Sequence, residues 1–182
     1  MILDRNDAGQ FFRLWWDLLF YTNQKLDLIK DLPLADAFSA LSSELTAKVR
    51  DKIWEDGSTI LQNYILENPN KLPADDLEIL KSWKCKLKST FIIFKEYKNY
   101  TAFMANNRCY GVVSLSMPIS SLVYSMPALV EAVLLPFKGK IIYDSIIVSR
   151  NISFGPGMRK GFNSEFQEIK KSSGIILSLE QS

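Results

Sequence analysis

The chain has 182 residues, of which 47% are apolar and 23% are charged, and its formal net charge is +2. This composition excludes a disordered chain, because a polypeptide of this size and apolar content buries roughly 70% of its unfolded surface on folding. The sequence contains no histidine, which excludes Ser-His-Asp and Cys-His nucleophile pairs, histidine-ligated zinc and histidine-ligated haem. We therefore expect no cofactor and no metal site, and a non-enzymatic protein is favoured over an enzyme.

Two cysteines, Cys85 and Cys109, lie 24 positions apart, a spacing that matches neither a Cys-x-x-Cys motif nor a zinc cluster. The N-terminal residues lack the basic and apolar regions of a secretory signal, so we expect reduced thiols in a cytoplasmic protein. No run reaches the roughly 18 uncharged residues that a membrane span requires, and a membrane partner is not expected.

The small net charge combines two halves of opposite sign. Residues 1–83 contain nine Lys and Arg against fourteen Asp and Glu, whereas residues 84–182 contain thirteen against six. An acidic half followed by a basic half points to a partner surface on one of them.

The first half predicts a helical bundle. Large apolar residues recur at spacings of three and four from Phe11 to Ile29, which indicates a long helix over residues 7–29. Phe12, Trp16, Leu19 and Phe20 add a second apolar strip, so this helix is expected at the centre of the bundle. The same reasoning predicts further helices at residues 34–45, 46–54, 58–65 and 74–83.

The second half predicts a sheet. β-prone runs at residues 91–94, 100–105 and 109–115 form a meander, and residues 128–137 and 141–148 form two strands joined at Lys138-Gly139-Lys140. Helices are expected at residues 119–124 and 158–171, and a last strand at 175–179. The predicted class is α+β, segregated: a helical region (1–88), then a mostly antiparallel sheet of about six strands with one or two helices (89–182).

The segments Val130–Asp144 and Ser153–Lys160, with the closing Gly174-Ile175-Ile176, resemble a microbial protein family of unknown function. The resemblance covers residues 60–180 in order. It implies a prokaryotic, cytosolic source and a strand-turn-strand at residues 138–140, and it carries no catalytic residue.

Residues 153–160 are a candidate anion site. Gly155 and Gly157 let the backbone approach a ligand at a helix N-terminus, where Arg159 and Lys160 would add positive charge. The segment matches neither a P-loop nor a dinucleotide fingerprint, and Pro156 removes one amide donor. A plain strand-to-helix turn explains the same residues.

The basic half is a candidate nucleic-acid interface. Lysines interleaved with strand aromatics are typical of proteins that bind single strands by base stacking and backbone attraction, although aromatic residues also favour strands because they pack well there. The lysines are Lys84, Lys86, Lys88, Lys138 and Lys140, and the aromatics are Phe91, Phe94, Tyr97, Tyr100, Phe103 and Tyr110.

Trp15 and Trp16 are candidate interface residues. Adjacent residues point about 100° apart on a helix, so one of the two rings stays accessible when the other is buried. Burial of both in the core is the alternative. Tyr143 and Asp144, with Glu131 on the neighbouring strand, would be an acid-base group only if the carboxylates met, and the spacing does not place them together.

These observations favour a non-enzymatic, cytosolic interaction or regulatory protein that acts through a protein partner or as a homo-oligomer. Two alternatives stay open: a nucleic-acid-binding module that uses the basic half, and an enzyme acting on an anionic small molecule near residues 155–160.

Overall fold

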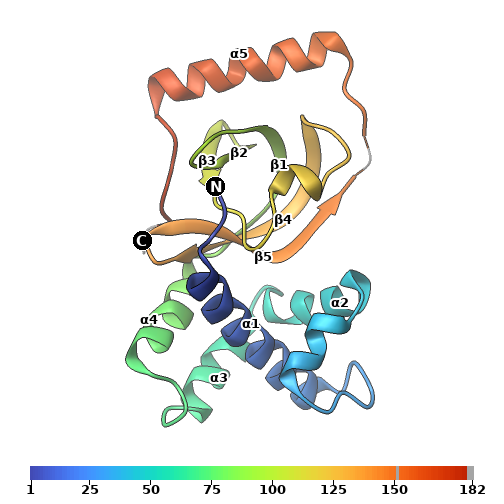
Figure 1. Cartoon of the computed structure of the whole chain (residues 1–182), viewed down its shortest axis with the longest axis vertical. Coiled ribbons are helices and arrows are strands. Elements are labelled where there is room, and N and C mark those ends of the chain that lie inside the picture. The colour runs from blue at the N-terminus through green and yellow to red at the C-terminus, as the bar shows by residue number, and fades with distance from the viewer. Residues whose placement is uncertain (151, 180–182) are drawn as a thin grey trace. The chain divides into compact units, whose positions relative to one another are not determined.

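The computed structural model describes residues 1–150 and 152–179, and the chain divides into two compact units. The helical unit is Arg5–Lys81, and the barrel unit is Met1–Asp4 with Ser82–Ser182. Figure 1 shows the predicted α+β class, with helices first, then strands and a final helix. The elements are α1 (Arg5–Leu26), η1 (Ala35–Ala40), α2 (Ser43–Ile53), α3 (Ile60–Glu67), α4 (Ala74–Ser82), η2 (Trp83–Cys85), β1 (Leu87–Glu96), β2 (Thr101–Ala105), β3 (Arg108–Val112), η3 (Ile119–Ser121), β4 (Ala128–Phe137), β5 (Lys140–Ser149) and α5 (Pro156–Ser172).

Helix α1 is the spine of the helical unit. One side of it is buried from Phe11 to Asn23, and Trp15 stacks on Trp54, with ring centroids 5.7 Å apart. The helix ends where the Asn23 side chain exchanges two 2.8 Å hydrogen bonds with the backbone of Ile29 and where Asp27 takes a positive φ. These bonds hold the loop that follows the helix against its last turn.

The segment after α1 differs from the prediction. Residues 34–45 were expected to be a helix, but the chain forms only the short 3-10 helix η1. Leu34 and Leu41, on either side of it, have extended backbones, and the Ser42 side chain accepts the Leu45 N–H to start α2. The segment therefore closes over α1 as a loop with one turn.

The five strands close into a barrel in the order β1-β2-β3-β5-β4. The meander β1-β2-β3 is confirmed, and β4 pairs antiparallel with both β1 and β5. The barrel is closed by a short parallel contact in which Val112 pairs with Ile141. Irregular register in β1, between Ile93 and Lys95, and in β4, between Ala132 and Leu134, bends the long strands as closure requires.

Two predicted features of the sheet need correction. There are five strands in the described residues and not six, and the sheet is mixed because β3 and β5 run parallel. The expected strand at 175–179 is an isolated parallel bridge between Tyr110 and Ile176. The Leu177 side chain of this segment packs so close to Gly111 that a Cβ there would lie 2.6 Å from one of its methyl carbons, so glycine at this position allows the close packing.

The hairpin at residues 138–140 is confirmed. Lys138 and Gly139 both have positive φ angles, 48° and 71°, as a two-residue turn between antiparallel strands requires. Asn106 and Asn107 make the equivalent turn between β2 and β3, with φ angles of 50° and 57°.

Helix α5 covers the outer face of the meander (Figure 1). Phe166 and Ile169 of α5 are buried against Ala102, Met104 and Cys109. Phe162 of α5 and the half-buried Ile92, Phe94, Tyr97, Tyr100 and Ile175 surround this cluster. The barrel interior is a separate cluster, in which Phe91 makes edge contacts with Phe103 and Tyr110 at 5.7 and 6.1 Å.

A helix that crosses a membrane needs about 20 residues that are predominantly apolar. No helix in the described part of the chain combines the necessary length with the necessary hydropathy.

Candidate functional site: the open face of helix α1

A stripe of three aromatic side chains lies on the open face of α1. Phe12, Trp16 and Phe20 follow one another at intervals of four residues, which places them on one side of the helix, and each is half-buried. The rings of Phe12 and Trp16 stack with their centroids 5.3 Å apart. We call these three residues the aromatic stripe.

The two adjacent tryptophans have different environments. Trp15 is completely buried, between Phe11 and Trp54, whereas Trp16 reaches the surface. Since the other two tryptophans, Trp54 and Trp83, are no more than 2% exposed, Trp16 is the one tryptophan that a partner can touch.

An apolar groove runs beside the stripe. It has a volume of about 550 Å³ and is lined by Gly9, Phe12 and Trp16 on one side and by Leu34 and Ala35 on the other. The Leu34 side chain is 62% exposed at its rim.

The groove is bordered by acidic groups. Asp17 and Asp36 line it, and Asp31 lines a second hollow of about 600 Å³ that continues past Phe20. None of these three carboxylates has an ion-pair partner among the described residues. The helical unit carries nine Lys and Arg against thirteen Asp and Glu, so the open face of α1 lies in a negative field.

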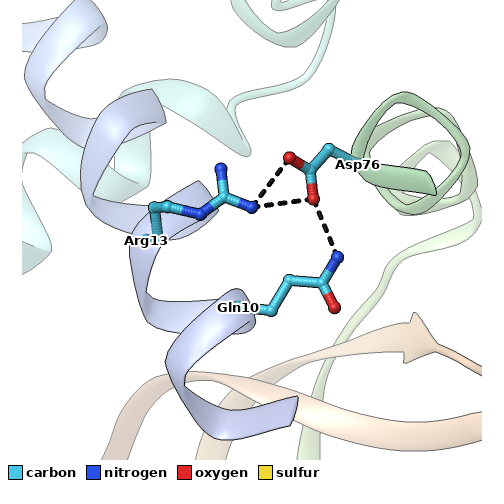
Figure 2. Close-up of polar contacts among 3 residues, drawn as sticks. All are labelled: Gln10, Arg13 and Asp76. Carbon is cyan, nitrogen blue, oxygen red and sulfur yellow. Dashed lines mark hydrogen bonds and ion pairs between the residues drawn. The ribbon is translucent and has the colours of Figure 1, made fainter. Parts of the chain in front are cut away.

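On its other flank the stripe adjoins a polar cluster, shown in Figure 2. Asp76, at the start of α4, is 1% exposed and accepts hydrogen bonds from Arg13 Nη2 at 2.7 and 2.8 Å and from Gln10 Nε2 at 2.8 Å. A buried carboxylate needs such donors, and the pairing holds the Arg13 guanidinium, 49% exposed, in a fixed position.

A second, smaller cavity lies beyond Arg13. It has a volume of about 320 Å³, and Asp17, Tyr64 and Lys71 are among the side chains that line it. Burial raises the pKa of Tyr64 to about 12, with a further contribution from the negative charge of Asp17. Burial also raises the pKa of Asp17, against the opposing charge of Arg13.

The predicted anion site lies at an exposed helix start. Gly155 caps α5, and Gly157, Arg159 and Lys160 are exposed on its first turns. The Arg159 side chain donates hydrogen bonds to the carbonyl oxygens of Phe154 (2.9 Å) and Met126 (3.3 Å). These bonds connect the start of α5 to the loop before β4. Arg159, which the predicted anion site needs as a cation, therefore has a structural role.

The five predicted nucleic-acid lysines gather around one end of the barrel. Antiparallel pairing of Leu87 with Leu134 and of Phe137 with Lys140 brings the start of β1 next to the β4–β5 turn. The lysines of these segments are Lys84, Lys86, Lys88, Lys138 and Lys140. Five of the six aromatic residues expected to stack on bases lie elsewhere, inside the barrel or under α5; the sixth, Tyr110, is 6% exposed and lines a cleft with Lys86.

The carboxylates considered for acid-base chemistry are separated. Glu131 pairs in register with Val148, four residues from Asp144, which is about 13 Å along a strand. The Glu131 carboxylate forms an ion pair with Arg150, and the buried Asp144 accepts the Ile146 N–H at 3.4 Å.

The sequence analysis missed the cluster of Arg13, Asp17, Tyr64 and Asp76. The available signal was that Arg13 and Asp17 interrupt the apolar strips of α1 one turn apart. Asp76 stands in the first turn of α4, where a carboxylate is favourable near the helix dipole in any case, and nothing local in the sequence shows that it faces α1.

Comparisons with known proteins found no relative. No family model matches the chain, and no curated protein or solved structure is significantly similar to it. Among residues 1–150 and 152–179, no group of three or more His, Cys, Asp and Glu side chains is placed to hold a metal ion. The function is therefore inferred from the geometry of the open face of α1.

Proposed function

We propose that the protein is a non-enzymatic interaction module whose helical unit binds a basic, amphipathic helix of a partner protein along the open face of α1. The observation that carries this proposal is the aromatic stripe, whose three rings are only partly buried. Aromatic side chains, tryptophan above all, dominate the energetics of protein interfaces when a partner covers them.

The spacing of the stripe favours a helix as the bound element. Phe12 and Phe20 are eight residues apart, about 12 Å along the helix axis, and grooves lie beside the stripe. A helix seated in such a groove inserts apolar side chains at positions i, i+3 or i+4, and i+7 between the exposed rings.

The charges favour a basic partner. Asp17, Asp31 and Asp36 border the grooves, whereas the nearby cation, Arg13, is already paired with Asp76. Lys and Arg side chains flanking the apolar ridge of the partner helix would meet these carboxylates and direct its approach.

Site-specific photo-crosslinking in the native cell tests the proposal. A benzophenone amino acid replaces Phe12, Trp16 or Phe20 in the full chain, and mass spectrometry identifies the crosslinked segment. We expect adducts from all three positions to converge on one basic amphipathic helix. The matched control is Leu66, which is 75% exposed on α3 of the same unit and does not line either groove.

Three results would contradict the proposal. One is the absence of adducts from the stripe, another is the same set of adducts from position 66, and the third is an acidic or non-helical crosslinked segment. Leu34→Ala should reduce the yield at position 16 about tenfold, because burying a leucine contributes roughly 1.5 kcal/mol or more.

A second candidate function is nucleic-acid binding by the basic end of the barrel unit. It is favoured by the grouping of the five lysines and by a cleft of about 590 Å³ that Lys86, Arg108 and Tyr110 line. In five-stranded OB barrels the face of the second and third strands binds oligonucleotides. Here α5 covers that face, so contacts would be to phosphates without base stacking.

Fluorescence anisotropy with a labelled single-stranded oligonucleotide tests this second function. Binding at about 50 mM salt should weaken steeply at 200 mM, because phosphate contacts release counterions. Changing Lys84, Lys86, Lys88, Lys138 and Lys140 together to Ala should abolish it. Absence of binding at the lower salt concentration would exclude this candidate.

A further inference from the structure

The cavity of about 320 Å³ beyond Arg13 is a site of a different kind from the apolar groove. It lies between α1, α3 and the segment that precedes α4. Its volume falls at the lower end of the range of small-ligand pockets, about 300–1,000 Å³. A water molecule occupies about 30 Å³ of liquid, so the cavity holds a molecule of roughly ten non-hydrogen atoms.

Polar groups without a protein partner converge on this cavity. The Tyr64 hydroxyl, the Asp17 carboxylate and the Lys71 ammonium line it, and no hydrogen bond or ion pair within the described residues involves any of the three groups. Tyr64 is only 6% exposed. Asp17 is half-buried and Lys71 is exposed, so of the three only Tyr64 is largely withdrawn from water, and a hydroxyl in that position is normally satisfied by a ligand or by ordered water.

Contacts with the surrounding structure hold two of the cavity's side chains, Arg13 and Tyr64, in place. Only Nη2 of Arg13 bonds to Asp76, which leaves Nε and Nη1 available beside the cavity (Figure 2). The ring of Tyr64 packs edge-on against Tyr21, with centroids 5.2 Å apart. A preorganised site of this kind binds with less loss of side-chain entropy.

The arrangement of charge selects the class of ligand. A purely anionic ligand would pair with Arg13 and Lys71 but repel Asp17, and a purely cationic ligand would do the reverse. A small zwitterion satisfies both signs, and the ring surfaces of Phe20 and Tyr21 provide an apolar wall. We propose that this cavity binds a free α-amino acid, its carboxylate on Arg13 and Lys71 and its ammonium group on Asp17.

Calorimetry and thermal-shift measurements on the full chain test this site with the twenty L-amino acids at about 5 mM. We expect a subset to bind with Kd near or below 1 mM. For the best of them, the analogue without the carboxylate and the analogue without the amino group should each bind at least about tenfold more weakly.

Variants locate the binding to the cavity. Asp17→Asn and Lys71→Met should each weaken binding about tenfold, because each removes a charged hydrogen bond, and Tyr64→Phe should weaken it less. Lys48→Met, at an exposed lysine of α2 outside the cavity, should have no effect. Circular dichroism identifies any variant that fails to fold.

Several outcomes would overturn the proposal. They are no binding by any amino acid at 5 mM, unchanged affinity in both Asp17→Asn and Lys71→Met, and equal binding of the analogue that lacks the amino group. Asp17 lines both the cavity and the groove, whereas Lys71 lines only the cavity and Leu34 only the groove, so Lys71→Met and Leu34→Ala separate this proposal from the proposed protein interaction.

Discussion

The two units of this protein use aromatic residues in opposite ways. In the barrel unit Phe94 and Tyr97 lie on the outer face of the meander and are covered by Phe166 of α5, with ring centroids 5.1 and 5.7 Å apart. In the helical unit Phe12 and Trp16 lie on a second aromatic surface, which stays partly exposed beside the groove that Leu34 and Ala35 also line.

The difference shows why aromatic content alone does not locate a binding surface. Both surfaces are built by regular spacing along a helix or strand, and both bring rings together. What separates them is whether the chain supplies its own covering element. An aromatic surface that stays exposed gains free energy when a partner buries it. The burial of a covered surface already contributes to the stability of the fold.

The largest expected loss of stability follows from a change in the aromatic cluster that α5 covers. Phe166→Ala should lower the free energy of unfolding by about 3–5 kcal/mol, because it removes a 2% exposed ring from a packed cluster. Urea denaturation followed by circular dichroism measures the change. Met158→Ala, at a residue 55% exposed on the same helix, should leave stability nearly unchanged; equal effects would show that α5 does not pack on the barrel as described.

A smaller loss is expected in the helical unit when the buried carboxylate is removed. Asp76→Ala should cost about 2–3 kcal/mol, because Arg13 and Gln10 lose their acceptor. Glu78→Ala, at an exposed carboxylate on the same helix, should cost little. Combining Asp76→Ala with Arg13→Met should cost less than the sum of the two single changes, since each already breaks the pair.

The folded elements were largely predictable because their signals are local. The hairpin at Lys138-Gly139 and the start of α4 after Pro73 depend on a few adjacent residues. The class of the fold followed from the order of helices and strands. The parallel contact of Val112 with Ile141 that closes the barrel has no local signal, because it joins segments that no turn connects.

The candidate site was predictable only in part, for the same reason. Alternating exposure of Trp15 and Trp16 follows from helix geometry, and the structure places one ring inside and the other at the surface. The pairing of Arg13 with Asp76 spans 63 positions, and the cover that α5 places over Phe94 is equally long-range. Contacts of this kind depend on tertiary packing, which propensity and periodicity do not encode.

Alkaline pH provides a test of the covered surface through Cys109. Burial raises the pKa of its thiol from 9.0 to about 12, so the unfolded state loses this proton first. The stabilisation is therefore fully present below pH about 9 and declines as the pH rises toward 12. The melting temperature should fall over this range, and less steeply in Cys109→Val.

Thiol labelling separates the same two environments without unfolding the protein. At pH 8 an aromatic disulfide reagent should react with the half-buried Cys85 but not with Cys109, which is completely buried. If Cys109 were labelled as fast as Cys85, α5 would not cover Cys109 as described.

The smallest stability effect is expected for the uncovered surface. Trp16→Phe should change the free energy of unfolding by less than about 1 kcal/mol, because the ring is half-exposed and an aromatic residue is retained. The same change should remove most of the fluorescence that acrylamide quenches in the native state, since Trp15, Trp54 and Trp83 are no more than 2% exposed. Quenching unaffected by Trp16→Phe would mean that another ring is the accessible one. A large loss of stability would place Trp16 with the covered aromatics, and the open face of α1 would then be part of the core.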